Sequence, residues 1–277
     1  MAGFNVQERL GMEDLKRGIW KALLAEFLGN LLLNYYGCAS CIAWTKDTPE
    51  SVTPENEHVE NPRANHVLVA LTFGLVIMAI VQSIGHVSGA HVNPAVTCAM
   101  LITGNIAIIK GFLYIIAQCI GSLAGTAVLK AFTPNGTQGK LGATELGEDV
   151  LPIQGFGVEF MLGFVLVIVV FGVCDANRPE FKGFAPLVIG LTITLGHLAA
   201  LSYTGSSMNP ARTLGSAVVS GIWSDHWVYW LGPILGGCSA GLLYKYVLSA
   251  APVETTTEYS PVQLKRLDKK KEEDGMP

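Results

Sequence analysis

Residues 86–96 read H-V-S-G-A-H-V-N-P-A-V, and residues 203–214 read Y-T-G-S-S-M-N-P-A-R-T-L. In each stretch a loop of small residues ends at Asn-Pro-Ala, and a short apolar run follows. Asn is a preferred helix N-cap and Pro is tolerated at the first helical position, so both Asn-Pro pairs predict the start of a helix. The apolar runs 95–102 and 211–222 are shorter than the ~20 residues that cross a bilayer. They predict two half-length helices, which are typical of a transport site at membrane depth.

The composition indicates a chain that lies mostly in lipid. Of its 277 residues, 14% are charged, against ~25% in soluble domains. The 31 glycines lie largely inside the apolar runs, where they favour close packing of helices in a bilayer. The charges are confined to the ends and a few loops, and nothing indicates a nucleic-acid partner. We therefore expect an all-α, multi-pass membrane protein.

Hydropathy predicts six full spans around the two half-helices. The expected spans are ~19–44, ~66–85, ~110–131, ~153–173, ~184–202 and ~227–249. One channel domain is expected at 19–250, with repeats at ~19–131 and ~153–249. It lies between a cytoplasmic N-terminal tail (1–18) and a polar cytoplasmic C-terminal tail (251–277) that we expect to be disordered.

The placement of Lys and Arg predicts the orientation in the membrane. Thirteen of the 18 fall on one side of the expected spans, four fall on the other, and Arg212 lies in the second Asn-Pro-Ala segment. Both termini are therefore expected in the cytoplasm. The loop at ~132–152 is then outside, and it holds the one N-glycosylation sequon, which starts at Asn135.

The chain repeats itself. Each repeat contains three full spans, an odd number, so the second copy must enter the membrane in the opposite direction. An inverted repeat brings the two half-helices together at the midplane from opposite faces. The matching pairs are Glu26 and Glu159, Asn93 and Asn209, Tyr114 and Tyr229, and Gly121 and Gly236.

Two opposed helix N-termini predict a site that repels cations, because each carries about half a positive charge. The side-chain amides of Asn93 and Asn209 are expected to donate to a passing oxygen while their carbonyls cap the helices. The loops before each motif leave carbonyls that must line a wet cavity or be bonded by protein. These expected pore-lining residues are Gly89, Ala90, His91, Val92, Gly205, Ser206, Ser207 and Met208. Glu26 and Glu159 are charges in apolar spans, and we expect them to brace these loops by accepting backbone N–H groups.

The two motifs, the repeated glutamates and the segment H-W-V-Y-W-L-G-P resemble the aquaporin (major intrinsic protein) family over residues ~19–249. The resemblance implies a bundle of six transmembrane helices plus two half-helices, with Asn93, Pro94, Ala95, Asn209, Pro210 and Ala211 at the pore centre. It also implies water as permeant, a homotetramer with one pore per subunit, and a plasma-membrane location. It points to the water-selective animal branch, with an insect or other invertebrate source left open.

The resemblance implies that four residues of this sequence form the narrowest part of the pore. They are the aromatic Phe73, His197 in the fifth span, Ser206 in the second loop, and Arg212. Glycerol-conducting members resemble this set but have Gly in place of the histidine and Asp after the arginine, where this chain has Thr213. The resemblance therefore implies a water-selective filter.

Three other readings remain open. A wider pore would also pass glycerol, urea or peroxide, and a scaffold or adhesion member of the family would conduct poorly. A secondary transporter would need acidic residues for ion coupling at the midplane, and the two glutamates are better explained as braces. No nucleophile–base pair or metal-ligand cluster is evident in the sequence, so we expect no enzyme, no catalytic residue, no metal and no cofactor.

Overall fold

The computed structural model describes residues 18–42 and 65–251 and consists of helices and loops there, without strands. The predicted tails and most of the loop at ~45–65 lie outside these residues. The long helices are α3 (Trp20–Ala39), α4 (His66–Ser88), α6 (Ile108–Phe132), α7 (Pro152–Cys174), α8 (Ala185–Thr204) and α10 (Val228–Leu243). The short ones are α5 (Pro94–Ile102) and α9 (Pro210–Ser220), with 3-10 turns η2 (Asn135–Thr137) and η3 (Pro179–Phe184), and a π-helical turn η4 (Tyr244–Leu248) that extends α10. The predicted fold class is confirmed.

The predicted spans correspond to the six long helices with shifts at their ends. Among the described residues, α4, α6, α7 and α8 are long and apolar enough to cross a membrane by length and composition alone. Helix α3 is less apolar because it carries Lys21, Glu26, Asn30 and Asn34, and it ends at Ala39, about five residues before the predicted end. Helix α10 has 16 residues before the π-helical turn begins at Tyr244.

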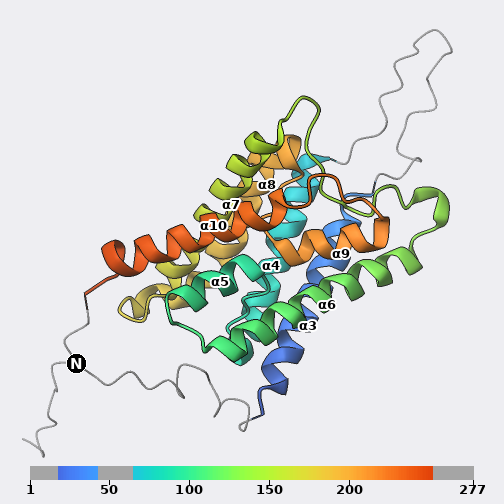
Figure 1. Ribbon diagram of the computed structural model, residues 1–277. Helices are drawn as coiled ribbons and strands as arrows, with labels where there is room; N and C mark the ends of the chain where they lie inside the picture. Colours follow the sequence, from blue (N-terminus) through green and yellow to red (C-terminus); the bar gives the residue numbers. More distant parts are fainter. Residues whose placement is uncertain (1–17, 43–64, 252–277) are drawn as a thin grey trace, which may run out of the picture.

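The half-helices lie between the long helices of the bundle (Figure 1). They have 9 and 11 residues, close to the lengths expected from the sequence. Helix α5 packs against α10, and α9 packs against α6. Each half-helix therefore lies against the last long helix of the other repeat, and this exchange joins the two repeats into one bundle.

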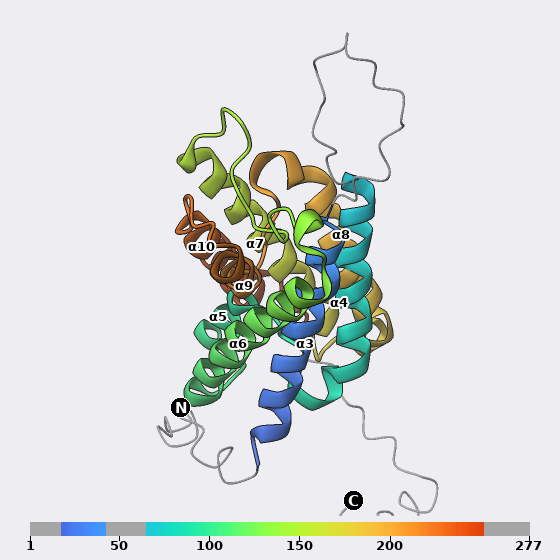
Figure 2. The same ribbon diagram turned by 90° about the vertical axis from the view of Figure 1, so that its right-hand side faces the viewer.

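The long helices pack in matching pairs in the two repeats. Helix α3 contacts α6 and α4, as α7 contacts α10 and α8 (Figure 2). Gly121 and Gly236 lie at these contacts: a Cβ atom at Gly121 would be 2.2 Å from the carbonyl oxygen of Phe27, and one at Gly236 would be 1.9 Å from that of Phe160. The helix backbones touch at both positions, as in small-residue packing of membrane helices.

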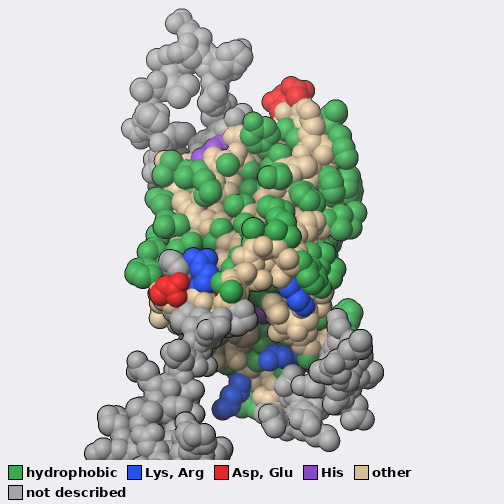
Figure 3. Space-filling model, turned by 90° about the vertical axis from the view of Figure 1, so that its left-hand side faces the viewer, with side chains coloured by type: hydrophobic (Ala, Val, Ile, Leu, Met, Phe, Trp, Pro, Cys, Tyr) green, Lys and Arg blue, Asp and Glu red, His purple; other side chains and the backbone are tan. Residues whose placement is uncertain are grey.

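The outer surface is apolar around most of the bundle. Figure 3 shows a broad band of hydrophobic side chains on one face, with Lys and Arg side chains gathered toward the lower end. On α3 the exposed apolar side chains recur every fourth residue, at Trp20, Leu24, Leu28, Leu32 and Tyr36. Such a stripe on the outside of a helix fits contact with lipid or with another apolar subunit, because large exposed apolar patches are rare on soluble monomers.

Candidate functional site

The two Asn-Pro-Ala segments begin α5 and α9 in the same way. The Asn93 Oδ1 atom accepts a hydrogen bond from the backbone N–H of Ala95 at 2.8 Å. The Asn209 Oδ1 atom accepts from the N–H groups of Ala211 and Arg212 at 3.1 and 3.2 Å. Each proline occupies the first turn of its helix. Both asparagines are thus N-caps, and capping fixes the orientation of their side chains.

The two loops exchange hydrogen bonds through the same asparagines. The Asn93 Nδ2 atom donates to the carbonyl oxygen of Met208 at 2.9 Å, and Asn209 Nδ2 donates to that of Val92 at 2.8 Å. The N-termini of the two half-helices are therefore tied together. A side-chain amide has two N–H donors, so one hydrogen on each asparagine remains for another acceptor.

The loops before the asparagines have an unusual backbone. Gly89 and Gly205 end the preceding helices with φ of +88° and +72°. Beyond them, four non-glycine residues also have positive φ, and they occupy matching positions in the two repeats. They are Ala90 (46°), Val92 (49°), Ser206 (50°) and Met208 (56°). Such backbone is costly, above all for a β-branched residue, and persists where surrounding contacts impose it.

The first of these loops is held by Glu26, which is fully buried. Its Oε1 atom accepts from the Ser88 hydroxyl at 2.6 Å and from the His91 N–H at 3.0 Å. Its Oε2 atom accepts from the Val92 N–H at 2.7 Å and from Gln118 Nε2 at 2.8 Å. Every one of these donors is buried with it or nearly so, which a carboxylate at membrane depth requires.

Glu159 holds the second loop in the same manner. Its Oε1 atom accepts from the Thr204 hydroxyl at 2.7 Å and from the Ser207 N–H at 2.9 Å. Its Oε2 atom accepts from the Met208 N–H at 2.9 Å. The hydroxyls of Ser88 and Thr204 were missed in the sequence, although they lie 116 residues apart, the same offset as the two asparagines.

A cavity of about 220 Å³ is lined on one side by residues of the two loops that precede the half-helices. Three long helices each line it with residues four apart, which follow one face over about 12 Å of helix. These residues are Phe73, Ile77 and Val81 of α4, Leu166, Val170 and Cys174 of α7, and Ile189, Ile193 and His197 of α8. The loops contribute Gly89, Ala90, His91, Val92, Asn93, Ser207, Met208 and Asn209. The cavity thus has an apolar wall facing a polar backbone.

Three of the four predicted filter residues meet at this cavity. The rings of Phe73 and His197 are stacked, with centroids 4.4 Å apart. The guanidinium carbon of Arg212 lies 5.1 Å from the centre of the Phe73 ring. Arg212 NH1 donates to the carbonyl oxygen of Gly142 at 2.7 Å. The Phe73 ring, the His197 imidazole and the Arg212 guanidinium are therefore neighbours in one part of the cavity wall.

Two polar atoms of this group have no protein partner within the described ranges. They are Arg212 Nε and His197 Nε2, both buried. The His197 Nδ1 atom lies 2.9 Å from the carbonyl oxygen of Ile193, so Nδ1 carries the proton and Nε2 of the neutral ring is an acceptor. One buried donor and one buried acceptor of this group are thus left unsatisfied by the described residues.

The remaining predicted positions are placed differently. Ser206 is fully buried with its hydroxyl unpaired, but neither Ser206 nor Gly205 is among the residues that line the cavity. The predicted glycosylation residue, Asn135, is exposed at the start of η2, and its side-chain oxygen accepts from Gln138 Nε2 at 3.1 Å.

The fold and sequence have clear relatives. The family described as Major intrinsic protein matches residues 14–244. Aquaporin-4 of Mus musculus is 44% identical over 232 residues, which are 83% of this chain and 68% of that protein. Aquaporin-1 of Homo sapiens is 38% identical over 247 residues, 89% of each chain. The X-ray structure of the aquaglyceroporin from Plasmodium falciparum is similar with a TM-score of 0.69 and 23% identity, over 83% of this chain and 96% of that one; this is a likeness of fold alone.

Proposed function

This chain belongs to the major intrinsic protein (aquaporin) family, and from that premise we propose that it is a water-selective channel. It is a membrane channel and not an enzyme. In the proposed function, water follows an osmotic gradient in either direction through the cavity, while protons, ions and glycerol are excluded.

The two walls of the cavity support passage of single water molecules. Residues of the two loops line the cavity and carry backbone hydrogen-bonding groups, whereas the side chains of Ile77, Leu166 and Ile189, which also line it, carry none. Water therefore exchanges hydrogen bonds with one side only and is not held from all directions. The carbonyls of Val92 and Met208 each already accept one amide hydrogen, and a carbonyl oxygen has a second lone pair for water.

The centre of the cavity supports exclusion of protons. The N-termini of α5 and α9 meet there, and their partial positive charges of about half a unit each add at one place. The remaining amide hydrogens of Asn93 and Asn209 are donors to the oxygen of a passing water. A water whose oxygen is held in this way turns its own hydrogens outward, which interrupts the chain along which a proton would move.

The observation that carries the proposal is the meeting of Phe73, His197 and Arg212. A stacked aromatic pair and a guanidinium lie together in the cavity wall, and two of their buried polar atoms, Arg212 Nε and His197 Nε2, have no protein partner among the described residues. The fixed positive charge of Arg212 opposes cations, because an unpaired charge in a low-dielectric wall acts strongly. Ser206 is the fourth position of the proposed filter through the family resemblance.

The test is to replace both His197 and Arg212 by small residues (His197→Gly with Arg212→Val). Removal of the imidazole and the guanidinium widens the opening, so proteoliposomes with the double variant should take up glycerol as well as water. Lys140→Ala serves as the control because it removes an exposed positive charge from a nearby loop. A double variant that folds, conducts water and still excludes glycerol would show that these residues do not form the filter.

The location and assembly are proposed with this function. We place the channel in the plasma membrane with both termini in the cytoplasm, since Lys and Arg gather toward the end of the bundle where α3 begins (Figures 2 and 3). The apolar stripe on α3 and similar stripes on other helices support a homotetramer in lipid with one pore in each subunit.

A further inference from the structure

One turn of α3 lies behind the proposed filter without lining the cavity. Asn34, Gly37 and Cys38, which we call the α3 turn, contact three different parts of the filter. Asn34 meets the backbone of Arg212, Gly37 meets the ring of Phe73, and Cys38 meets Gly142, whose carbonyl binds the guanidinium. All three residues are buried. A single helical turn thus contacts the Phe73 ring, the backbone of Arg212 and the loop residue whose carbonyl binds the Arg212 guanidinium.

Asn34 uses both hydrogens of its amide. Its Nδ2 atom donates to the carbonyl oxygen of Arg212 at 3.1 Å and to the Thr126 hydroxyl at 3.0 Å. The space for this contact is provided by Gly215, where a Cβ atom would be 2.8 Å from Asn34 Nδ2. The bond ties the first turn of α9, which carries Arg212, to α3. Asn34 therefore fixes the place from which the arginine side chain extends.

Gly37 contacts Phe73, and Cys38 contacts Gly142. A Cβ atom at Gly37 would lie 2.4 Å from Cε1 and 2.6 Å from Cζ of Phe73. The ring therefore occupies the space that any side chain at this position would need. A Cβ atom at Gly142 would lie 2.7 Å from that of Cys38, so Cys38 supports the loop that binds Arg212.

The second repeat shows that this polar contact is not a requirement of the fold. The offset of 133 that relates Glu26 to Glu159 relates Asn34 to Val167, Gly37 to Val170 and Cys38 to Phe171. Val167 and Phe171 lie against Gly237 and Gly241 of α10, and Val170 lines the cavity. A buried amide costs free energy unless it is bonded, and Asn34 keeps one unpaired atom, Oδ1. Helix packing alone therefore does not account for an amide at this position, which bonds to the first turn of α9.

We propose that the α3 turn sets the aperture of the filter from behind, with Asn34 and Gly37 as positioning residues that determine solute selectivity. Asn34 holds the backbone of Arg212 in place, and the absence of a side chain at Gly37 lets Phe73 lie back from the opening. The inference rests on the proposed function, since it concerns the same filter.

Two variants test the two contacts in opposite directions. Asn34→Leu keeps the number and branching of the side-chain heavy atoms and removes the bond to Arg212, so the arginine moves more freely. The ratio of glycerol to water permeability should rise about fivefold, the effect of one lost hydrogen bond on a barrier. Gly37→Ala pushes Phe73 toward His197 and Arg212, so water permeability should fall by about the same factor while glycerol stays excluded.

Matched controls separate positioning from folding. Asn30→Leu removes another fully buried amide of α3, which bonds to Glu26 and Ser122 but not to the filter. Gly172→Ala adds a methyl group where the nearest atom is 3.6 Å away. Both controls should retain the parent selectivity when permeability is expressed per folded channel. Because Asn34→Leu also removes an unpaired buried oxygen, we expect it to fold, and Gly37→Ala provides an independent test.

The outcomes distinguish this inference from the proposed function. If the parent itself passes glycerol or fails to conduct water, the proposed function is wrong. If the parent is water-selective, and Asn34→Leu and Gly37→Ala match Asn30→Leu and Gly172→Ala in both permeabilities, the α3 turn does not position the filter. Higher glycerol permeability in Asn34→Leu together with lower water permeability in Gly37→Ala would support it, since a general loss of folded channels would lower both permeabilities in both variants.

Discussion

At the scale of single residues, Asn93 and Asn209 each perform two tasks with one side chain. The oxygen caps a half-helix, and one amide hydrogen binds a carbonyl of the opposite loop. The second amide hydrogen of each asparagine has a fixed direction, because the bonds of the side-chain oxygen and of the first amide hydrogen prevent the amide from rotating. A donor fixed in this way needs little reorganisation when water arrives, which favours fast passage.

The buried glutamates are also fixed by their partners, and Glu159→Gln tests this. The substituted amide presents an N–H₂ group where an oxygen now accepts from the Met208 N–H or from Thr204 and Ser207. At least one buried donor then loses its acceptor. We expect the free energy of unfolding to fall by about 1–3 kcal/mol, the cost of leaving such a group unsatisfied, as measured by thermal melting in detergent.

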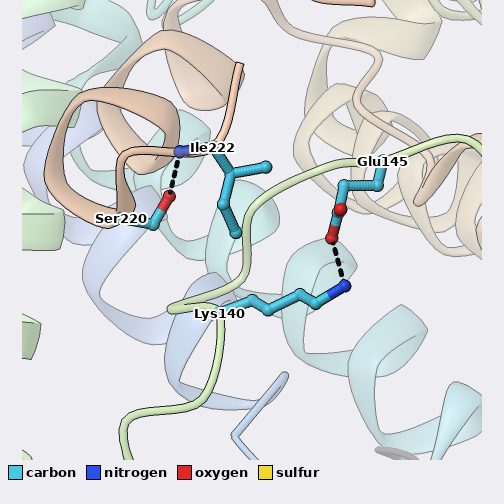
Figure 4. A network of polar contacts seen from close by, with 4 residues as sticks. All are labelled: Lys140, Glu145, Ser220 and Ile222. Atoms are coloured by element: carbon cyan, nitrogen blue, oxygen red, sulfur yellow. Dashed lines mark hydrogen bonds and ion pairs between the residues drawn. The ribbon is translucent and has the colours of Figure 1, made fainter. Parts of the chain in front are cut away.

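Glu145→Gln is the matched control for this prediction. Lys140 and Glu145 point toward each other across an exposed loop (Figure 4), with the ammonium nitrogen 2.6 Å from the carboxylate. Their side chains are 67% and 31% exposed, and exposed pairs contribute about 0–1 kcal/mol. Equal melting temperatures for the two variants would mean that Glu159 does not brace its loop.

Individual side chains were predictable from the sequence where the two repeats match. The asparagines, prolines and glutamates recur at fixed offsets, so their pairing could be inferred. The exchange of amide–carbonyl bonds between the loops, and the bond from Asn34 to Arg212, join residues 115 to 178 positions apart. No local pattern reports such contacts, because they depend on how the helices pack.

At the scale of elements, the close contact between α7 and α10 depends on a residue without a side chain. We expect Gly236→Ala to separate these helices, because its Cβ atom would be 1.9 Å from the carbonyl oxygen of Phe160. Overpacking of this kind costs about 1–3 kcal/mol, seen as a lower melting temperature. Gly172→Ala on α7 adds the same methyl group in ordinary contact, and a variant at 236 that melts no lower than this control would contradict the packing.

The end of α10 is fastened to the end of α7 outside the membrane-spanning segments. Asp175 caps α7, and its Oδ2 atom accepts from the N–H of Ala250 at 3.0 Å and from the Tyr244 hydroxyl at 2.9 Å. The N–H of Asn177 bonds to Oδ1. The backbone N–H groups of Ala250 and Asn177 lower the pKa of the Asp175 carboxyl group below its usual value, with smaller contributions from Tyr244 and Arg178.

This lowered pKa predicts the pH dependence of the fastening. A carboxylate with a lower pKa in the folded state stabilises the contact above its unfolded pKa of ~3.9, and this contribution is lost as the pH falls through the folded value. Hydrogen-exchange protection of residues 244–251 should therefore be constant near neutral pH and fall below about pH 4. Asp175→Asn should lower it already at pH 7. Unchanged protection in that variant would mean that other contacts hold the end of α10.

The elements themselves were largely predictable, and their ends were not. The Asn-Pro pairs located α5 and α9 because capping and the fixed φ of proline act within a few residues. The early end of α3 and the π-helical turn after Leu243 were missed. Both lie in apolar or weakly polar runs where hydropathy does not change. The bonds of Ala250 with Asp175 and of Lys245 with Thr103 accompany the second.

At the scale of the whole molecule, two repeats of one design give a channel that is symmetric at its centre and asymmetric at its filter. The half-helices cross to the opposite repeat, and the glutamates and asparagines match on both sides. The residues of the proposed filter, Phe73, His197 and Arg212, lie together, and the α3 turn contacts Phe73 and the backbone of Arg212. In the proposed function, exclusion of protons belongs to the symmetric centre, and selection by size belongs to one end.

The central claim is that this channel passes water and excludes glycerol. The most direct measurement is stopped-flow light scattering of proteoliposomes after an osmotic step, made in parallel with sucrose and with glycerol as the osmolyte. We expect fast shrinkage in both, with no re-swelling in glycerol beyond that of empty liposomes. Rapid re-swelling in glycerol, or no water flux from channels shown to be folded, would contradict the account.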